Sequence, residues 1–364
     1  MKIGEFRKAI QTAERKDLEK TAACLYKMLN KAQKEEMDED LLEIIHGNSE
    51  RVAKGKKKEE VIDFNELAQE VNQFLSYARD GLYCYANWTV SKQKRSNWRH
   101  EFNRYFNQLV SIEAGSPDYE QAGELLMKLF RILGMGCSFR TFVSTNPFEA
   151  VKIQQVQFVK LLADRFCTPE TPPEKLDDFL YLVNGTGMDY MTLRAEFYPV
   201  INDRLVDFQF RNRVIERLEN LRKQTCKLEK LGLNINYEDF MSNDAYESIP
   251  RLILYLMAKS DRYTVDDILK VVRNEIQSIV DEYEGRSPYS KSVRSHMDPE
   301  QVKRQVDRFG EIQLFVALSV LNQAGRDDLW IAAFEDTTKK FKITPRDSLL
   351  ELYQQKKAVR KRAA

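Results

Sequence analysis

Histidine and cysteine are scarce in this sequence of 364 residues. It has three histidines, His46, His100 and His296, and none has a second histidine or a cysteine close by in the sequence. The five cysteines are an odd number and lie 30 residues or more apart. Zinc sites usually show ligand pairs at short spacing, and disulfide frameworks show an even number of closely spaced cysteines. We therefore predict no metal site and no disulfide framework.

Long apolar runs and an excess charge of one sign are also absent. No stretch approaches the roughly 18 apolar residues of a transmembrane helix, and the mean hydropathy is −0.54. Lys and Arg total 57 against 56 Asp and Glu, a net charge of +1, so no global field attracts the chain to nucleic acid or to a membrane. Residues 1–8 lack the apolar core of a signal peptide. We expect a cytoplasmic protein that does not associate with membranes.

Signatures of catalysis and of cofactor binding are missing as well. Gly134-Met135-Gly136 and Gly185-Thr186-Gly187 each give a Gly-x-Gly, but neither has the third glycine of a dinucleotide fingerprint or the Gly-Lys-Ser/Thr of a P-loop. Both are typical of helix termini. We therefore predict no cofactor and no catalytic residues. An enzyme whose active site is assembled from distant helices, with His100 among tyrosines and arginines, stays an open alternative.

Signals for helix starts are abundant. Half of the ten prolines directly follow a residue that caps helices well, and proline suits the first helical position because its missing N–H would have no partner there. These pairs are Ser116-Pro117, Asn146-Pro147, Thr171-Pro172, Asp298-Pro299 and Thr344-Pro345. Thr264 with Asp267 marks a further start without proline.

Apolar residues between these signals recur at three and four positions, which is the period of an amphipathic helix. The alternation over residues 137–143 is short and lacks a partner run, which favours a short helix or a loop. Residues 311–321 are apolar on nearly every side, so we expect this helix to be buried on most sides, within the chain or in a dimer interface; the oligomeric state stays open. The sequence thus predicts an all-α fold of about 14–16 helices.

So many helices joined by short turns stack most simply as antiparallel pairs, in an α-solenoid or in helical bundles. In this architecture the chain resembles helical-repeat proteins of the tetratricopeptide or HEAT-like kind. The resemblance implies an extended stack of helix pairs. It transfers no functional residue, because the sequence shows no recurring repeat motif.

Composition divides the chain into four parts. Residues 48–61 are charged and almost free of apolar side chains, so we predict a flexible linker. Residues 1–47 then form a small N-terminal helical unit, and residues 62–341 form the main helical-repeat domain, with a possible sub-boundary at 285–297. Residues 342–364 form a basic C-terminal helix or tail.

Two basic segments are candidates for partner binding. In residues 83–106 aromatic side chains alternate with positive charge, and cations with exposed rings can bind nucleic acid. Trp98, Phe102, Tyr105 and Leu109 recur at helical spacing, however, which favours a core stripe for these rings. The candidate binding residues here are Trp88, Lys92, Lys94, Arg95, Arg99, His100 and Arg104. At the C-terminus they are Lys356, Lys357, Arg360, Lys361 and Arg362.

The sequence favours a non-enzymatic helical scaffold that binds a protein or peptide partner between its helices. The first alternative is a nucleic-acid-binding protein that uses residues 83–106 and the basic C-terminal tail. The second is the enzyme with an active site built from distant helices. The sequence does not identify the partner.

Overall fold

The structure of the protein is a computed structural model, and it describes residues 10–29, 34, 63–225, 236–283 and 298–363. The chain divides into two compact units, residues 1–63 and 64–364. The predicted linker at 48–61 and the predicted sub-boundary at 285–297 lie outside the described residues, as does most of the predicted N-terminal unit.

The all-α prediction is confirmed: the described residues form fourteen α-helices and one 3₁₀ helix, and no β-strand occurs among them. The first unit contains α2 (Arg15–Met28), none of whose side chains is buried. The second unit contains α5 (Phe64–Arg79), α6 (Lys92–Val110), α7 (Tyr119–Ser138), α8 (Pro147–Val151), α9 (Gln155–Phe166), α10 (Pro173–Gly185), the 3₁₀ helix η1 (Arg194–Glu196), α11 (Phe197–Asn202), α12 (Phe208–Gln224), α13 (Tyr237–Ala258), α14 (Val265–Tyr283), α15 (Pro299–Gln323), α16 (Asp327–Phe341) and α17 (Asp347–Ala363).

The predicted helix starts lie at or close to the observed ones. Asp298 caps α15 with a reciprocal capping box, since its side chain accepts from the Gln301 N–H while Gln301 accepts from the Asp298 N–H. α8 begins at Pro147, as expected. α7, α10 and α17 begin one or two residues after the predicted proline. At α7 a turn closed by the Ser116 carbonyl comes first.

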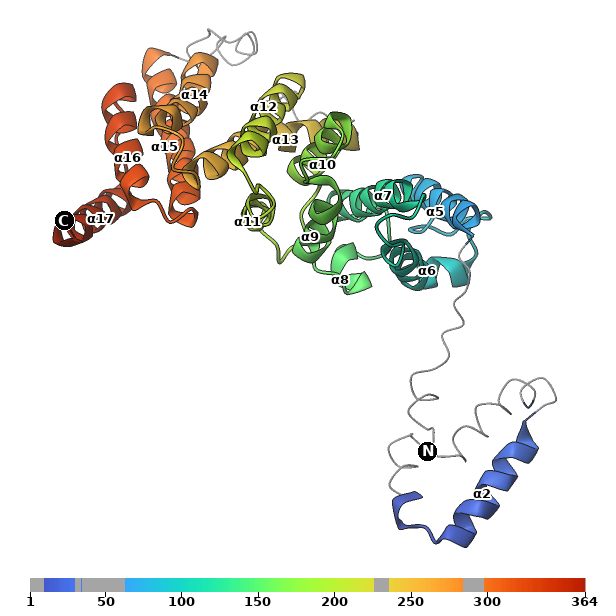
Figure 1. Ribbon diagram of the computed structural model, residues 1–364. Coiled ribbons are helices and arrows are strands. Elements are labelled where there is room, and N and C mark those ends of the chain that lie inside the picture. Colours follow the sequence, from blue (N-terminus) through green and yellow to red (C-terminus); the bar gives the residue numbers. More distant parts are fainter. Residues whose placement is uncertain (1–9, 30–33, 35–62, 226–235, 284–297, 364) are drawn as a thin grey trace. The chain divides into compact units, whose positions relative to one another are not determined.

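Helices that are close in sequence pack against one another throughout the second unit (Figure 1). α5, α6, α7 and α8 form one group, and α14, α15 and α16 form another, with α17 packed on α16. α7 connects the first group to α9 and α10, and α13 contacts α10, α11 and α12 as well as α14 and α15 of the second group. The C-terminal half of α13 is accordingly buried on almost every side. This packing is compatible with a helical-repeat architecture.

The prediction that residues 311–321 are buried on most sides holds except along one exposed face, since six of these eleven residues are buried. They lie in α15, whose other faces pack on α13, α14 and α16. Phe315 is 57% exposed and Ile312 is 40% exposed. With Leu349 and Leu352 of α17 they line a groove of about 310 Å³. We refer to it below as the C-terminal groove.

The two Gly-x-Gly segments pack against each other. Gly134 and Gly136 lie near the end of α7, and Gly185 is the last residue of α10. A Cβ atom on Gly187 would lie 2.3 Å from the Gly134 carbonyl oxygen, and one on Gly134 would lie 2.7 Å from Cγ2 of Thr186. These glycines therefore let the end of α7 approach the backbone of residues 185–187 closely, which explains them without a phosphate ligand.

Candidate functional site

Most of the large rings in the basic aromatic segment belong to the core. Trp98, Phe102 and Tyr105 are buried along one face of α6, as the helical spacing predicted. Trp98 stacks on Phe142, with ring centroids 4.0 Å apart and 16° between the planes. Phe142 also lies within an aromatic cluster with Phe74 and with Tyr83, which precedes α6. These buried rings cannot stack on an external ligand.

Trp88 differs from the other rings, because its side chain is fully exposed. Its loop is nevertheless held by hydrogen bonds. The Asn87 amide donates to the carbonyls of Leu82 and Tyr85, each at 2.7 Å, and its Oδ1 accepts from the N–H of Val90 at 2.7 Å. Arg95 donates from α6 to the carbonyls of Asn87 and Val90. The chain thus presents a tryptophan to solvent on a fixed loop.

The cations of this segment fall into two groups. Arg95 braces the Trp88 loop, and Arg104 forms an ion pair with Glu70 at 2.7 Å and lies over the Tyr105 ring. The remaining candidates lie exposed along α6, and none of them has an ion-pair partner within the described ranges. These are Lys92, Lys94, Arg99 and His100.

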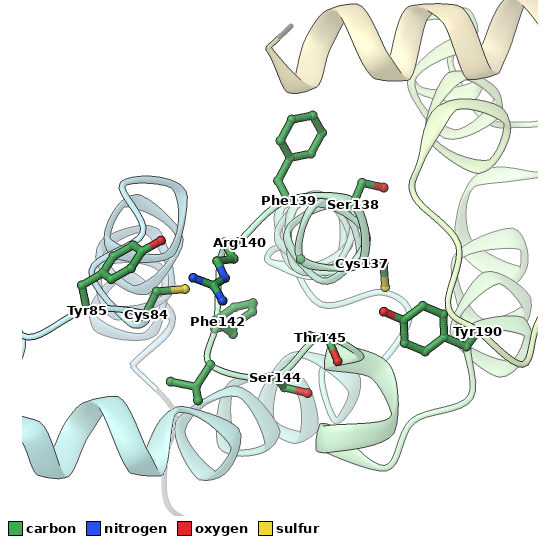
Figure 2. Close-up of a pocket in the computed structure, with 12 residues that line it drawn as sticks. Cys84, Tyr85, Cys137, Ser138, Phe139, Arg140, Phe142, Ser144, Thr145 and Tyr190 are labelled. Atoms are coloured by element: carbon green, nitrogen blue, oxygen red, sulfur yellow. The ribbon is translucent and has the colours of Figure 1, made fainter. Parts of the chain in front are cut away.

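A pocket of about 320 Å³ opens beside this segment, at the end of α7. We call it the α7 pocket. Figure 2 shows Cys84, Tyr85 and Arg140 on one side of it, and Tyr190 on the other side with its hydroxyl toward Cys137 and Thr145. The lining comprises Cys84, Tyr85, Gly136, Cys137, Ser138, Phe139, Arg140, Phe142, Val143, Ser144, Thr145 and Tyr190. The pocket therefore lies between residues 83–106, which the sequence predicted as a binding segment, and two segments for which it predicted no binding. These two are residues 136–145 and the loop that carries Tyr190.

Tyr190 lies on a second loop that side chains hold in place. Gln155, which is wholly buried, donates to the Gly187 carbonyl at 2.9 Å and accepts from the Asp189 N–H at 3.1 Å. Asp189 Oδ1 in turn accepts from the N–H groups of Met191 and Thr192, at 2.8 and 2.7 Å. Hydrogen bonds from side chains therefore hold this loop, as they hold the Trp88 loop.

The end of the second loop is anchored by Arg194. Its guanidinium donates to the carbonyls of Val183 and Thr186, at 2.8 and 2.6 Å, and pairs with Asp244 at 2.9 Å. These carbonyls close the last turn of α10, so one side chain both caps that helix and fixes the chain that follows the loop.

Apolar side chains project into solvent from both fixed loops and from the segment after α7. Tyr190 is 71% exposed and Met191 is 86% exposed. Together with Trp88 they belong to a set of exposed apolar residues, three of which, Tyr85, Val143 and Tyr190, line the α7 pocket. We name this set the Trp88–Tyr190 surface. Its members are Tyr85, Trp88, Val143, Tyr190, Met191 and Leu193.

Among the described residues that line the α7 pocket, Arg140 alone carries a formal charge. It is exposed, and its guanidinium has no hydrogen-bond or ion-pair partner in the described part of the chain. Its neighbour Phe142 is buried in the aromatic cluster, which fixes the backbone that carries Arg140. The pocket therefore combines apolar rims with one unpaired cation.

The two thiols in the pocket are held in the neutral form. Burial raises the pKa of Cys137 to about 12. Burial also raises the pKa of Cys84, although the positive charge of Arg140 opposes this shift. The reactive form of cysteine is the thiolate, so neither group is activated as a nucleophile.

The C-terminal candidates also divide into paired and unpaired cations. Lys356 pairs with Asp327 and lies over the Trp330 ring, and Lys357 pairs with Glu335 at 2.8 Å. Both therefore attach α17 to α16. Arg360, Lys361 and Arg362 lie exposed in the last turn of α17, without an ion-pair partner among the residues described.

Sequence reasoning missed Arg140, Val143, Tyr190 and Met191. The signal available for the last two was a short segment rich in apolar residues, Met188, Tyr190, Met191 and Leu193, which Asp189 and Thr192 interrupt. Within the described ranges, no group of three or more His, Cys, Asp or Glu side chains is placed to hold a metal ion. None of the described helices has the length and apolar character needed to span a bilayer.

Comparisons with models of protein families, with curated proteins and with solved structures give no match.

Proposed function

We propose that this chain is a non-enzymatic, cytoplasmic helical-repeat scaffold that binds a protein or peptide partner on the Trp88–Tyr190 surface. The observation that carries the proposal is the pair of fixed loops, which expose Trp88, Tyr190 and Met191. Each loop also supplies a tyrosine, Tyr85 or Tyr190, to the lining of one pocket. Single exposed apolar side chains are common on proteins, but a group of them around a hollow is typical of an interaction site.

The way in which the loops are held supports the same function. A loop that becomes ordered only on binding loses conformational entropy, and this loss weakens the affinity. The Asn87 and Gln155 hydrogen bonds fix the two loops in the free protein. Tryptophan and tyrosine are the side chains that most often dominate binding energy at protein interfaces, and these loops present both.

The proposal is tested by selecting binders from a random peptide library against the full chain and measuring their affinity by fluorescence anisotropy. We expect Trp88→Ala and Tyr190→Ala each to weaken binding by about thirty-fold or more, as substitution at a hot spot does. The matched control is Phe315→Ala, which removes an exposed aromatic ring from the C-terminal groove. Equal binding by the native chain and by the Trp88→Ala, Tyr190→Ala double variant would contradict the proposal.

Nucleic acid is the second candidate, because Trp88 lies just before the exposed cations of α6. A fluorescein-labelled oligothymidine tests it. Stacking on Trp88 and contacts from Lys92 and Arg99 predict binding that weakens steeply as salt rises. Binding that survives the Lys92→Glu, Arg99→Glu double variant unchanged would exclude this candidate.

A further inference from the structure

We infer that the α7 pocket binds an acidic peptide segment, in which an aspartate or glutamate side chain pairs with Arg140 and apolar neighbours contact Tyr85, Val143 and Tyr190. This inference rests on the proposed function and adds the chemistry of the partner to it. It follows from charge, from hydrogen-bonding capacity and from the position of the apolar rims.

The lining of the pocket carries positive charge. Among the described residues of the lining, Arg140 is the only charged one. The carboxylate of Asp189 lies outside the lining, although its negative charge helps to raise the pKa of Cys137. α6 contacts the same segment through the stacked rings of Trp98 and Phe142, and it carries the exposed cations Lys92 and Arg99. A cationic lining attracts an anionic group and disfavours a basic one.

The nearby carboxylates are already engaged within the chain. Glu149 accepts from the Asn146 amide at 3.3 Å. Asp189 accepts the backbone N–H groups of its own loop. Glu101 accepts from the Tyr83 hydroxyl at 3.4 Å. These carboxylates thus have partners of their own, and Arg140 is left for an external one.

Hydrogen-bonding groups around Arg140 suit a carboxylate. A guanidinium offers a planar fork of donors that matches the two oxygens of a carboxylate. The hydroxyl of Thr145 also lines the pocket, and this residue is exposed. The hydroxyl of Ser138 points away from Arg140 (Figure 2) and lies beside Gly187. Ser144, by contrast, is bound to the backbone of Asn146. The pocket can therefore bind the carboxylate directly through Arg140, with the Thr145 hydroxyl as a second donor in the same lining.

The apolar rims set what flanks the acidic residue. Tyr85 and Tyr190 lie on opposite sides of the pocket, with Arg140 beside Tyr85 (Figure 2). Val143, which is 71% exposed, adds an aliphatic rim. A peptide whose carboxylate contacts Arg140 thus meets an apolar surface on either side. We expect aromatic or aliphatic residues next to the acidic one.

The test selects peptides from a random library, displayed with their C-termini fused to a phage coat protein so that no free terminal carboxylate is present. The targets are the full native chain, Arg140→Gln and Arg140→Glu. We expect the native chain to enrich peptides with Asp or Glu at one fixed position beside apolar residues. Arg140→Gln should lower the affinity for these peptides by about ten- to hundred-fold, because charge-assisted hydrogen bonds are lost. Arg140→Glu should enrich Lys or Arg at the same position.

Arg79→Gln, which removes an exposed arginine outside the α7 pocket, is the matched control and should leave binding unchanged.

The outcomes separate this inference from the proposed function. Peptides that require Trp88 and Tyr190 but have no acidic residue, or that bind Arg140→Gln as well as the native chain, overturn the inference alone. If oligothymidine displaces the selected peptides from Arg140, this result overturns the inference in favour of a phosphate ligand. Failure to select any peptide that depends on Trp88 and Tyr190 overturns the proposed function itself.

Discussion

The indole of Trp98 in α6 stacks on the ring of Phe142, at 4.0 Å between centroids and 16° between planes. Phe142 lies midway through the irregular segment between α7 and α8. The contact buries this ring while Arg140 and Val143, on either side of it, stay exposed. A single core contact thus fixes the segment that supplies the charge and one apolar rim of the α7 pocket.

Replacing this ring should disrupt both the core and the pocket. Phe142→Ala is expected to lower the free energy of unfolding by about 3–5 kcal/mol, the usual cost of removing a buried phenylalanine. Chemical denaturation monitored by circular dichroism measures the change. Val143→Ala, one residue away on the exposed side, serves as the control and should change stability by less than about 0.5 kcal/mol. Similar values for the two variants would contradict the assignment of Phe142 as the anchor.

Gln155 should be essential to the shape of the second loop. Gln155→Leu keeps much of the side-chain volume but leaves the Gly187 carbonyl and the Asp189 N–H without their partner. We expect a loss of about 1–3 kcal/mol in stability, because buried polar groups are left unsatisfied. Hydrogen exchange should also quicken at residues 189–192. Unchanged exchange in that loop would show that Gln155 does not hold it.

Close packing of α7 on residues 185–187 predicts a contrast between two glycines. Gly187→Ala places a methyl group against the Gly134 carbonyl, so we expect destabilisation of about 1–3 kcal/mol. Gly310→Ala in α15 has its closest contact with the end of the Ile343 side chain, at 3.1 Å, and meets Ile276 only at 3.9 Å. Alanine also favours a helix interior over glycine by about 1 kcal/mol. The Gly187→Ala variant should therefore unfold at a clearly lower temperature than the Gly310→Ala variant. The reverse order is incompatible with the packing described.

An ion pair between α14 and α16 predicts how stability depends on pH. Arg273 donates to both oxygens of Asp336, at 2.7 and 2.8 Å, and these hydrogen bonds hold the pKa of Asp336 below its ordinary value. A lowered folded pKa stabilises the protein above the unfolded pKa of about 3.9, and this contribution is lost as the pH falls through the folded pKa.

The variant Asp336→Asn isolates this contribution. Near neutral pH it should lower the free energy of unfolding by about 1 kcal/mol, the upper range for exposed ion pairs. The difference from the native chain should shrink as the pH falls below about 4. Urea denaturation at a series of pH values measures it. A difference that stays constant into acid would mean that the carboxylate charge of Asp336 is not what stabilises the fold.

Local patterns in the sequence predicted the local structure well. The capping box at Asp298 and Gln301 involves neighbours in the chain, and so does the buried stripe of α6, so spacing alone suffices for both. The exposure of Phe315 was not predictable in this way, since it depends on which helices pack around α15. The α7 pocket combines Tyr85, Arg140 and Tyr190, which are about fifty residues apart from one to the next. Only the tertiary fold brings such residues together.

The central claim is that a partner covers Trp88, and the fluorescence of the three tryptophans tests it directly. Trp98 and Trp330 are buried and only Trp88 is exposed, so iodide should quench chiefly Trp88 in the free protein. The exposed cations Lys92 and Arg99 nearby should make anionic iodide a better quencher than caesium. Trp88→Phe is the control and should remove the quenchable component. With a peptide selected as described above at saturation, the account predicts that Trp88 becomes protected from iodide. A bound peptide that leaves iodide quenching unchanged would contradict it.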